Sequence, residues 1–209
     1  MRKIQGLYAV TPDISDTPLL CQMVDAALQG GVNLVQYRNK LADKHLQFEQ
    51  ASALLKICRQ YQRSLIINDD VMLAKRIDAD GVHLGKSDGE IAMARTILGA
   101  DKIIGASCYN QIELAKNAAT QGASYIAFGA CFASSTKPNA PTASLTLFKE
   151  AKKLNLPIVA IGGITLQNAH VVKDAGAHAI AVVNALFSSQ NIAQTATQFK
   201  HIFNEDHSS

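Results

Sequence analysis

Short apolar segments that alternate with longer amphipathic ones are the feature that most restricts the fold of this chain. The apolar segments are rich in β-branched and aliphatic residues, and they have the continuous apolar character of strands that are buried on both faces. Between them, apolar residues recur at helical spacing. The pattern predicts eight strands, each followed by a helix, over residues 6–11, 33–38, 64–68, 79–85, 102–107, 125–129, 157–161 and 179–183.

Helix start and stop signals support this alternation. Asp16 or Thr17 can cap a helix that begins at Pro18 and stops at Gly30. Further helices are expected over about residues 43–62, 71–76, 88–98, 111–120 and 144–154, then from about residue 165, with a last one reaching residue 203.

The number of βα units favours a closed barrel. We therefore predict an α/β fold, a single-domain (β/α)8 TIM barrel over residues 1–209, in which residues 204–209 are a frayed tail. A doubly wound open sheet is the alternative. The length of 209 residues suits one domain or at most two small ones, and no low-complexity linker divides the chain.

Composition and charge limit the partners of the protein. No apolar run approaches the roughly 18 residues that span a bilayer, and no signal-type segment follows Met1, so we expect a cytoplasmic protein without a membrane partner. The net charge of +3 is weak and dispersed, which argues against nucleic acid and favours small anionic substrates. The four cysteines are far apart, which predicts reduced thiols and no zinc site. A homo-oligomer is compatible with the sequence.

Polar residues follow the second, third and fourth strands at the edge where a barrel of this kind forms its active site. Arg38 and Lys40, which share a face with Gln36, can grip a phosphate; a solvated strand end is the alternative. Asp69 and Asp88 lie at neighbouring strand ends and suit Mg²⁺, which prefers carboxylates together with substrate phosphates. Asp88 is alternatively only a helix cap.

Two further candidates lie on the fourth and fifth strands. Alternation along the strand can aim His83 into the barrel mouth, although a lone strand histidine is more often a satisfied core residue. Ser107 ends the fifth strand and is weaker evidence by itself.

The segment 129–141 has the composition of an anion-binding loop. Hydroxyl groups of Ser134, Ser135 and Thr136 can donate to phosphate oxygens, and Lys137 adds a compact positive charge. A polar surface loop is the alternative reading of the same composition.

A glycine pair follows the seventh strand. Gly162 and Gly163 stand between strand and helix, where backbone amides can close on an anion. Together with Val183 and Asn184 after the last strand, they occupy the place where barrels of this type commonly bind a phosphate, although a plain glycine turn would look the same. The mouth thus has one site for a phosphate monoester and a second, more cationic site that suits a metal-bound pyrophosphate leaving group.

An ordered set of motifs over nearly the whole chain resembles the thiamine phosphate synthase family. The motifs are Gly6-Leu-Tyr-Ala-Val-Thr11, Gln36-Tyr-Arg-Asn-Lys40, Ile67-Asn-Asp69, residues 79–85 with Asp88, Ile104-Gly-Ala-Ser107, Ser134-Ser-Thr-Lys-Pro138 and Ala160-Ile-Gly-Gly-Ile164. The resemblance implies a (β/α)8 transferase that joins 4-amino-2-methyl-5-hydroxymethylpyrimidine diphosphate to a thiazole phosphate, or its carboxylate form. The implied products are thiamine phosphate and pyrophosphate, formed with Mg²⁺ through a pyrimidine methylene cation.

The same resemblance implies roles for individual residues. Asp69 and Asp88 would hold Mg²⁺, and Lys137, Arg38 and Ser107 would act in catalysis. The substrate contacts would come from Gln36, Arg38, Lys40, Asn68, His83, Ser107, Ser134, Thr136 and Lys137 on the pyrimidine side, and from Gly163, Val183 and Asn184 on the thiazole side. No protein nucleophile is required by this mechanism.

Two positions depart from the family pattern. Ser134 stands where the family often has threonine, which keeps the hydroxyl, and Asn184 stands where it frequently has serine. The second change leaves a side-chain contact to the thiazole phosphate open, and backbone amides can serve in its place. Three alternatives are open: a related barrel that only aromatises the thiazole phosphate, a binding protein without turnover, and a sugar-phosphate isomerase. None of them explains the second, cationic site as well as the synthase does.

Overall fold

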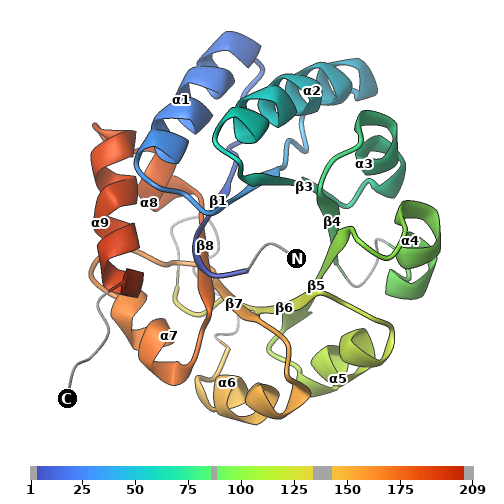
Figure 1. Cartoon of the computed structure of the whole chain (residues 1–209). Coiled ribbons are helices and arrows are strands. Elements are labelled where there is room, and N and C mark those ends of the chain that lie inside the picture. The colour runs from blue at the N-terminus through green and yellow to red at the C-terminus, as the bar shows by residue number, and fades with distance from the viewer. Residues whose placement is uncertain (1–3, 86–88, 134–142, 205–209) are drawn as a thin grey trace.

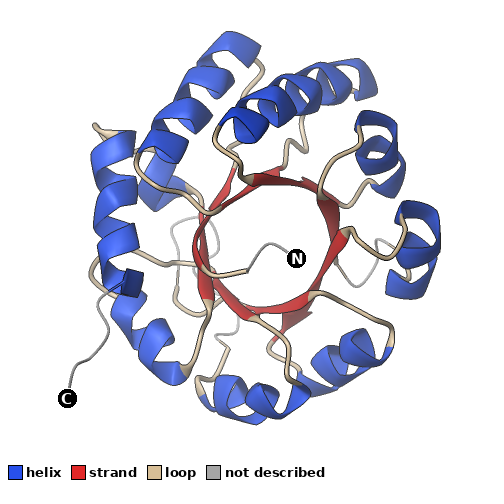
Figure 2. Cartoon of the chain, viewed as in Figure 1, coloured by secondary structure: helices blue, strands red, loops and turns tan. Residues whose placement is uncertain are grey.

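The strands of this protein form one closed parallel barrel. The computed structural model describes residues 4–85, 89–133 and 143–204. Each strand pairs with the strands before and after it in sequence, and β8 closes onto β1. Figure 2 shows the ring of strands at the centre with the helices outside it. The predicted TIM barrel is confirmed, and the open-sheet alternative is wrong.

The elements lie close to the predicted segments. The strands are β1 (Gly6–Val10), β2 (Leu34–Tyr37), β3 (Ser64–Asn68), β4 (Gly81–Leu84), β5 (Ile103–Tyr109), β6 (Tyr125–Phe128), β7 (Ile158–Ile161) and β8 (Ala179–Val182). The helices are α1 (Thr17–Gln29), α2 (Lys44–Gln60), α3 (Val71–Ile77), α4 (Ile91–Leu98), α5 (Ile112–Thr120), α6 (Thr146–Ala151), α7 (Ala169–Ala175), α8 (Asn184–Phe187) and α9 (Ile192–Asn204).

Aspartates fix the start of three helices. Asp16, Asp43 and Asp70 precede α1, α2 and α3, and each accepts a hydrogen bond of 2.8 Å from the backbone amide three residues later. These bonds satisfy amides that have no partner inside the helix. Asp16, one of the two caps expected from the sequence, is therefore the residue that caps α1.

The last βα unit contains one short helix more than expected. After β8 the chain forms α8, and α9 begins only at Ile192. Asn191 explains the new start, because its side chain accepts from the Gln194 amide at 3.0 Å and its carbonyl accepts from the Thr195 amide. In Figure 1, α9 lies beside α1 and completes the ring of helices. Residues 205–209 of the predicted tail lie outside the described residues.

Alternation along each strand divides the apolar side chains between two clusters. On β1, Leu7 and Ala9 point outward and pack under the helices, whereas Tyr8 and Val10 point into the barrel. The interior is crowded: a Cβ at Gly105 would lie 2.0 Å from Cζ of Tyr125. Glycine at this position of β5 therefore makes room for the tyrosine ring of β6. Across the described ranges, no helix combines the length and apolar character needed to cross a membrane.

Candidate active site at the mouth of the barrel

Three small cavities lie where the barrel strands end. One of about 210 Å³ is at the ends of β2 and β3, one of about 220 Å³ is beside β4 and β5, and one of about 320 Å³ is at β7 and β8. A larger cavity of about 800 Å³ lies at the opposite end, where Asn33, Pro157 and His178 precede their strands. We place the chemistry at the mouth, because side chains from several strand ends converge there in folds of this kind.

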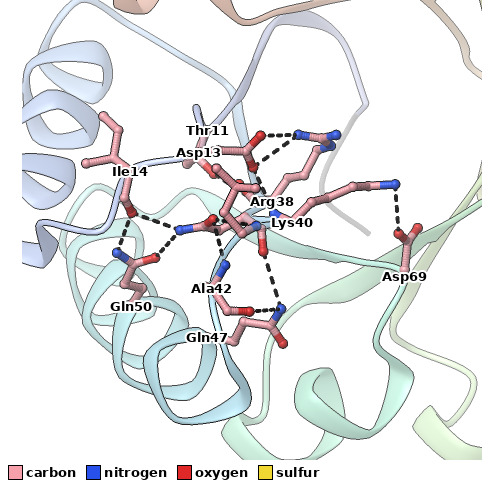
Figure 3. Close-up of polar contacts among 11 residues, drawn as sticks. Thr11, Asp13, Ile14, Arg38, Lys40, Ala42, Gln47, Gln50 and Asp69 are labelled. Atoms are coloured by element: carbon pink, nitrogen blue, oxygen red, sulfur yellow. Dashed lines mark hydrogen bonds and ion pairs between the residues drawn. The ribbon is translucent and has the colours of Figure 1, made fainter.

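Arg38, Lys40, Asn68 and Asp69 line the first cavity together. Nζ of Lys40 lies 3.8 Å from Oδ2 of Asp69, so the ends of β2 and β3 are joined by an ion pair. Figure 3 shows the Lys40 side chain extending toward Asp69, while the Arg38 side chain points to Asp13. The sequence prediction that these four residues meet at one edge of the barrel agrees with this geometry.

Backbone conformation separates the roles of Asp69 and Asp70. Asp69 has a left-handed φ of 61°, and its amide donates to the carbonyl of His83 at 2.9 Å. Asp70 caps α3 and accepts from Nζ of Lys44 at 2.7 Å. Burial acts to raise the pKa of Asp70, but the bonds from Lys44 and from the helix amide outweigh it, so this pKa lies below its ordinary value. Asp70 thus serves mainly the helix start.

Asp13 is a residue at this site that sequence reasoning missed. Its carboxylate pairs with Nη1 of Arg38 at 3.1 Å and accepts from the Lys40 amide at 2.8 Å. Thr11 adds two bonds, because its hydroxyl accepts from the Arg38 amide and donates to the Arg38 carbonyl. The position of Thr11 and Asp13 in the sequence could have indicated this role, because both follow β1 and so lie at the same edge of the barrel as the residues that follow β2.

A buried glutamine on α2 holds the two loops that carry these side chains. Gln50 is fully buried; its amide nitrogen donates to the Ile14 carbonyl, and its oxygen accepts from Tyr37 Oη and Asn39 Nδ2 at 2.9 and 3.0 Å. Asn39 also donates to Ile14. Figure 3 shows Gln50 and Ile14 on the side of this network away from Asp69. The cluster clamps the loops after β1 and β2 against each other.

Polar side chains inside the barrel form a chain of hydrogen bonds below the mouth. Gln36 donates to Tyr8 Oη at 2.9 Å, and the hydroxyl groups of Tyr8 and Tyr125 are 2.8 Å apart. Tyr125 contacts Nδ1 of His83, and Nε2 of His83 contacts the Ser107 hydroxyl, both at 2.8 Å. His83 does point into the barrel, as expected. The two tyrosines were missed, although their inward strand positions were readable from alternation.

Burial defines the protonation of this interior. Tyr8 and Tyr125 are 1% and 0% exposed, and desolvation raises the pKa of both far above the ordinary phenol value. Both rings are therefore neutral and carry one hydroxyl proton each. The His83 and Tyr125 rings are stacked, with centroids 5.5 Å apart, which fixes the plane of the imidazole.

Gly163, Val183 and Asn184 line the cavity at β7 and β8. Gly163 has a φ of 64°, and a Cβ there would lie 2.5 Å from the Phe132 carbonyl oxygen, so only glycine fits this close approach. Asn168 fixes the turn, because it donates to the Gly163 carbonyl and accepts from the Thr165 amide.

The turn after β7 leaves amides for an anion. Within the part of the chain that the structure describes, the amides of Gly163 and Ile164 donate to no backbone or side-chain acceptor. Amides without an acceptor beside two strand ends suit a phosphate group.

Four predicted site residues lie outside the described residues. These are Asp88, Ser134, Thr136 and Lys137. Their expected roles in metal and diphosphate binding stay predictions.

Known proteins resemble this chain over almost its full length. A family model described as thiamine monophosphate synthase matches residues 7–186. A thiamine-phosphate synthase from Methylobacillus flagellatus is 58% identical over 201 residues, which make up 96% of this chain and 96% of the relative. The corresponding protein of Chromobacterium violaceum is 52% identical over 194 residues, with coverage of 93% and 94%.

A solved structure extends the similarity to the fold. The thiamine phosphate pyrophosphorylase from Pyrococcus furiosus superposes with a TM-score of 0.85 at 32% identity, and the match covers 96% of each chain. The likeness therefore includes the barrel and the strand ends that form the mouth.

Proposed function

Because the chain belongs to the thiamine monophosphate synthase family and is a transferase that forms thiamine phosphate, we propose the following assignment of its reaction to its residues. The protein joins 4-amino-2-methyl-5-hydroxymethylpyrimidine diphosphate to the thiazole phosphate, or its carboxylate form, and releases pyrophosphate. The observation that carries the assignment is the meeting of Arg38, Lys40 and Asp69 at one cavity of the mouth.

The diphosphate occupies the cavity at the ends of β2 and β3. Arg38 offers a planar guanidinium that suits two phosphate oxygens, and Lys40 offers a mobile point charge. The ion pair with Asp13 positions Arg38, and the hydrogen bonds of Gln50 hold the loops after β1 and β2 together. Lys137, which follows β6 in the sequence, adds a further positive charge to the leaving group.

Mg²⁺ fits the donor chemistry of this edge. Asp69 supplies a carboxylate beside the phosphate-binding cations, and Asp88 supplies a second one from the loop after β4; hard oxygen donors of this kind are the ones Mg²⁺ prefers. When bound, Mg²⁺ neutralises charge on the diphosphate oxygens.

The thiazole phosphate occupies the cavity at β7 and β8. The amides of Gly163 and Ile164 bind the phosphate, and the start of α8 at Asn184 borders it. Val183 contributes an apolar wall. This site holds a phosphate that does not react, which positions the thiazole nitrogen for bond formation.

Bond breaking precedes bond making. The carbon–oxygen bond of the pyrimidine methylene group breaks, its electron pair leaves with the diphosphate, and the thiazole nitrogen then donates its lone pair to the methylene cation. Arg38, Lys40 and Lys137 stabilise the charge that grows on the leaving oxygens. Gln36, Asn68, His83 and Ser107 position the pyrimidine from the barrel interior, and Ser134 and Thr136, which follow β6 in the sequence, contact the same substrate.

Pyrophosphate release is the decisive measurement. The purified protein should release pyrophosphate and form thiamine phosphate only when pyrimidine diphosphate, thiazole phosphate and Mg²⁺ are all present. Binding of thiazole phosphate without any pyrophosphate release would refute the proposal and favour a protein that only binds or aromatises the thiazole.

Substitutions of Asp69 and Lys137 test the roles of single residues, with a substitution of Asp70 as a control. Asp69→Asn should raise the Mg²⁺ concentration needed for half-maximal rate, whereas Asp70→Asn, which keeps a good helix cap, should leave it unchanged. Lys137→Ala should reduce turnover far more than thiazole phosphate binding. Equal Mg²⁺ dependence in both aspartate variants would remove Asp69 from the metal site, and full turnover in Lys137→Ala would remove its leaving-group role.

The compartment and partners follow from the same proposal. The substrates are small anionic molecules, and neither a nucleic acid nor a membrane takes part. Cys21, Cys58, Cys108 and Cys131 are free thiols, which supports a reducing, cytoplasmic compartment.

A further inference from the structure

One hydrogen-bond chain crosses the barrel interior from β2 to β5. It runs from Gln36 through Tyr8, Tyr125 and His83 to Ser107, with every link between 2.8 and 2.9 Å. Its members come from five different strands, and all except Ser107 are buried. The hydrogen bonds therefore couple Gln36 and Ser107, the two polar groups at the ends of this chain.

The protons of this chain can be counted. Gln36 uses Nε2 as the donor to Tyr8. Among the described residues, Tyr8 Oη has only Gln36 and Tyr125 as partners, so its own proton must go to Tyr125. Tyr125 then donates to Nδ1 of His83, because its oxygen already accepts from Tyr8. Because Nδ1 of His83 accepts from Tyr125, the ring N–H that points to the Ser107 oxygen is on Nε2.

The polarity of the chain determines what each end offers to a ligand. Among the described residues, no fully buried side-chain oxygen or nitrogen lacks a partner, so the Gln36 oxygen, which has none there, is not fully buried and is available as an acceptor. Ser107 accepts from His83 and keeps its own hydroxyl proton to donate. Turning the Gln36 amide over would reverse every link and exchange both roles. The two ends are thus set together, never independently.

We propose that Tyr8 and Tyr125 are positioning residues that keep the Gln36 oxygen as a hydrogen-bond acceptor and the Ser107 hydroxyl as a hydrogen-bond donor. This arrangement of acceptor and donor makes the site select an aminopyrimidine. An aminopyrimidine offers an amino N–H to Gln36, and its ring nitrogens and diphosphate offer acceptors to Ser107. The 4-oxo analogue carries a carbonyl in place of the amino group and a ring N–H in place of the neighbouring nitrogen, so its polarity is opposite. This inference rests on the proposed function, because it assigns the specificity of the same site.

The first test reads the polarity without any substrate. Nitrogen-15 NMR of the wild-type protein, with His83 assigned by the signal missing in His83→Asn, should show the proton on Nε2 and an unprotonated Nδ1. A proton on Nδ1 would mean the reversed polarity and would overturn the proposal. The result of this measurement does not depend on whether the protein has catalytic activity.

The second test measures substrate discrimination. Tyr125→Phe keeps the ring and removes the link, so the ratio of kcat/KM for the amino substrate to kcat/KM for the 4-oxo analogue should fall at least tenfold, mainly through a higher KM for the amino substrate. Tyr8→Phe should act in the same direction and serves if Tyr125→Phe fails to fold. Tyr61→Phe is the matched control, because it removes a hydroxyl that binds Asp25 on the outer helices.

The outcomes separate this inference from the proposed function. If the tyrosines had a purely structural role, their replacement would lower kcat/KM equally for both substrates. An unchanged ratio of the two kcat/KM values in both Tyr→Phe variants, while the wild type is active, would overturn this inference and leave the proposed function standing. No pyrophosphate release by the wild type with either pyrimidine would overturn the proposed function, and the aminopyrimidine assignment with it.

Discussion

Replacing Gly105 with alanine tests whether the barrel interior is built around the Tyr125 ring. The new Cβ would lie 2.0 Å from Cζ and 2.3 Å from Oη of Tyr125. An ordinary carbon–carbon contact is about 3.5 Å, so the ring has to move by about 1.5 Å. The hydroxyl bonds of 2.8 Å to Tyr8 and His83 do not survive such a shift.

The expected cost is the balance of opposing effects. Alanine in a strand is favoured over glycine by about 0.5–1 kcal/mol. Overpacking in a well-filled interior costs about 1–3 kcal/mol, and each buried polar group left without a partner costs about 1–3 kcal/mol. Overpacking and the lost hydrogen bonds outweigh the strand preference for alanine, so we expect the free energy of unfolding to fall by about 3 kcal/mol. For a chain of this length, such a loss lowers Tm by roughly 6–12 °C.

Urea denaturation of a double-mutant cycle checks this reasoning. Gly105→Ala is measured once in the wild type and once in Tyr125→Leu, where the ring that causes the clash is gone. In the Tyr125→Leu background the alanine should cost less than about 1 kcal/mol. An equal loss in both backgrounds would refute the assignment of the cost to the tyrosine ring.

Three further predictions concern the mouth and one distant histidine. Asp13→Ala frees Arg38, and because partly exposed ion pairs contribute about 0.2–1 kcal/mol, KM for the pyrimidine diphosphate should rise about 1.4- to 5-fold in steady-state kinetics; an unchanged KM would contradict the positioning role. Gln50→Leu leaves buried partners unsatisfied and should lower the free energy of unfolding by about 2–4 kcal/mol in urea, whereas a loss below about 0.5 kcal/mol would show that the clamp is dispensable. Burial, aided by the charge of Lys152, lowers the pKa of His178 below its ordinary value of 6.5, and Nδ1 of His178 accepts a hydrogen bond from the Ile158 amide. The unfolded state therefore binds more protons than the folded state, so the free energy of unfolding should fall as the pH drops from 7 to 5. His178→Asn keeps an acceptor without titrating and should flatten that pH profile; an unaltered slope would exclude His178 as its source.

Much of the fold was readable from periodicity. Alternating strand and helix patterns predicted the closed barrel, and the helix caps Asp16 and Asp43 fall at or next to the expected starts. The short helix α8 escaped prediction because its four residues are too few for a periodic signal. Asn191, which separates α8 from α9, acts through a cap that is visible only with coordinates.

Part of the candidate site was readable because a parallel barrel gathers its strand ends. Arg38, Lys40 and Asp69 were expected together and do line one cavity. Asp13 and Gln50 were not found, because their role is to hold other residues, and a side chain that acts through another has no motif of its own.

The sequence by itself determined the class of fold, the edge of the barrel where chemistry belongs and the kinds of charge gathered there, since these depend on residue type and order along the chain. Only the tertiary structure decided which inward-facing side chains touch. Tyr8 and Tyr125 are 117 positions apart, and their hydroxyl groups meet because the barrel closes and Gly105 leaves space for the ring. Such contacts depend on the stagger of the strands and on the volumes of side chains across the barrel, and periodicity within a single strand predicts neither of them.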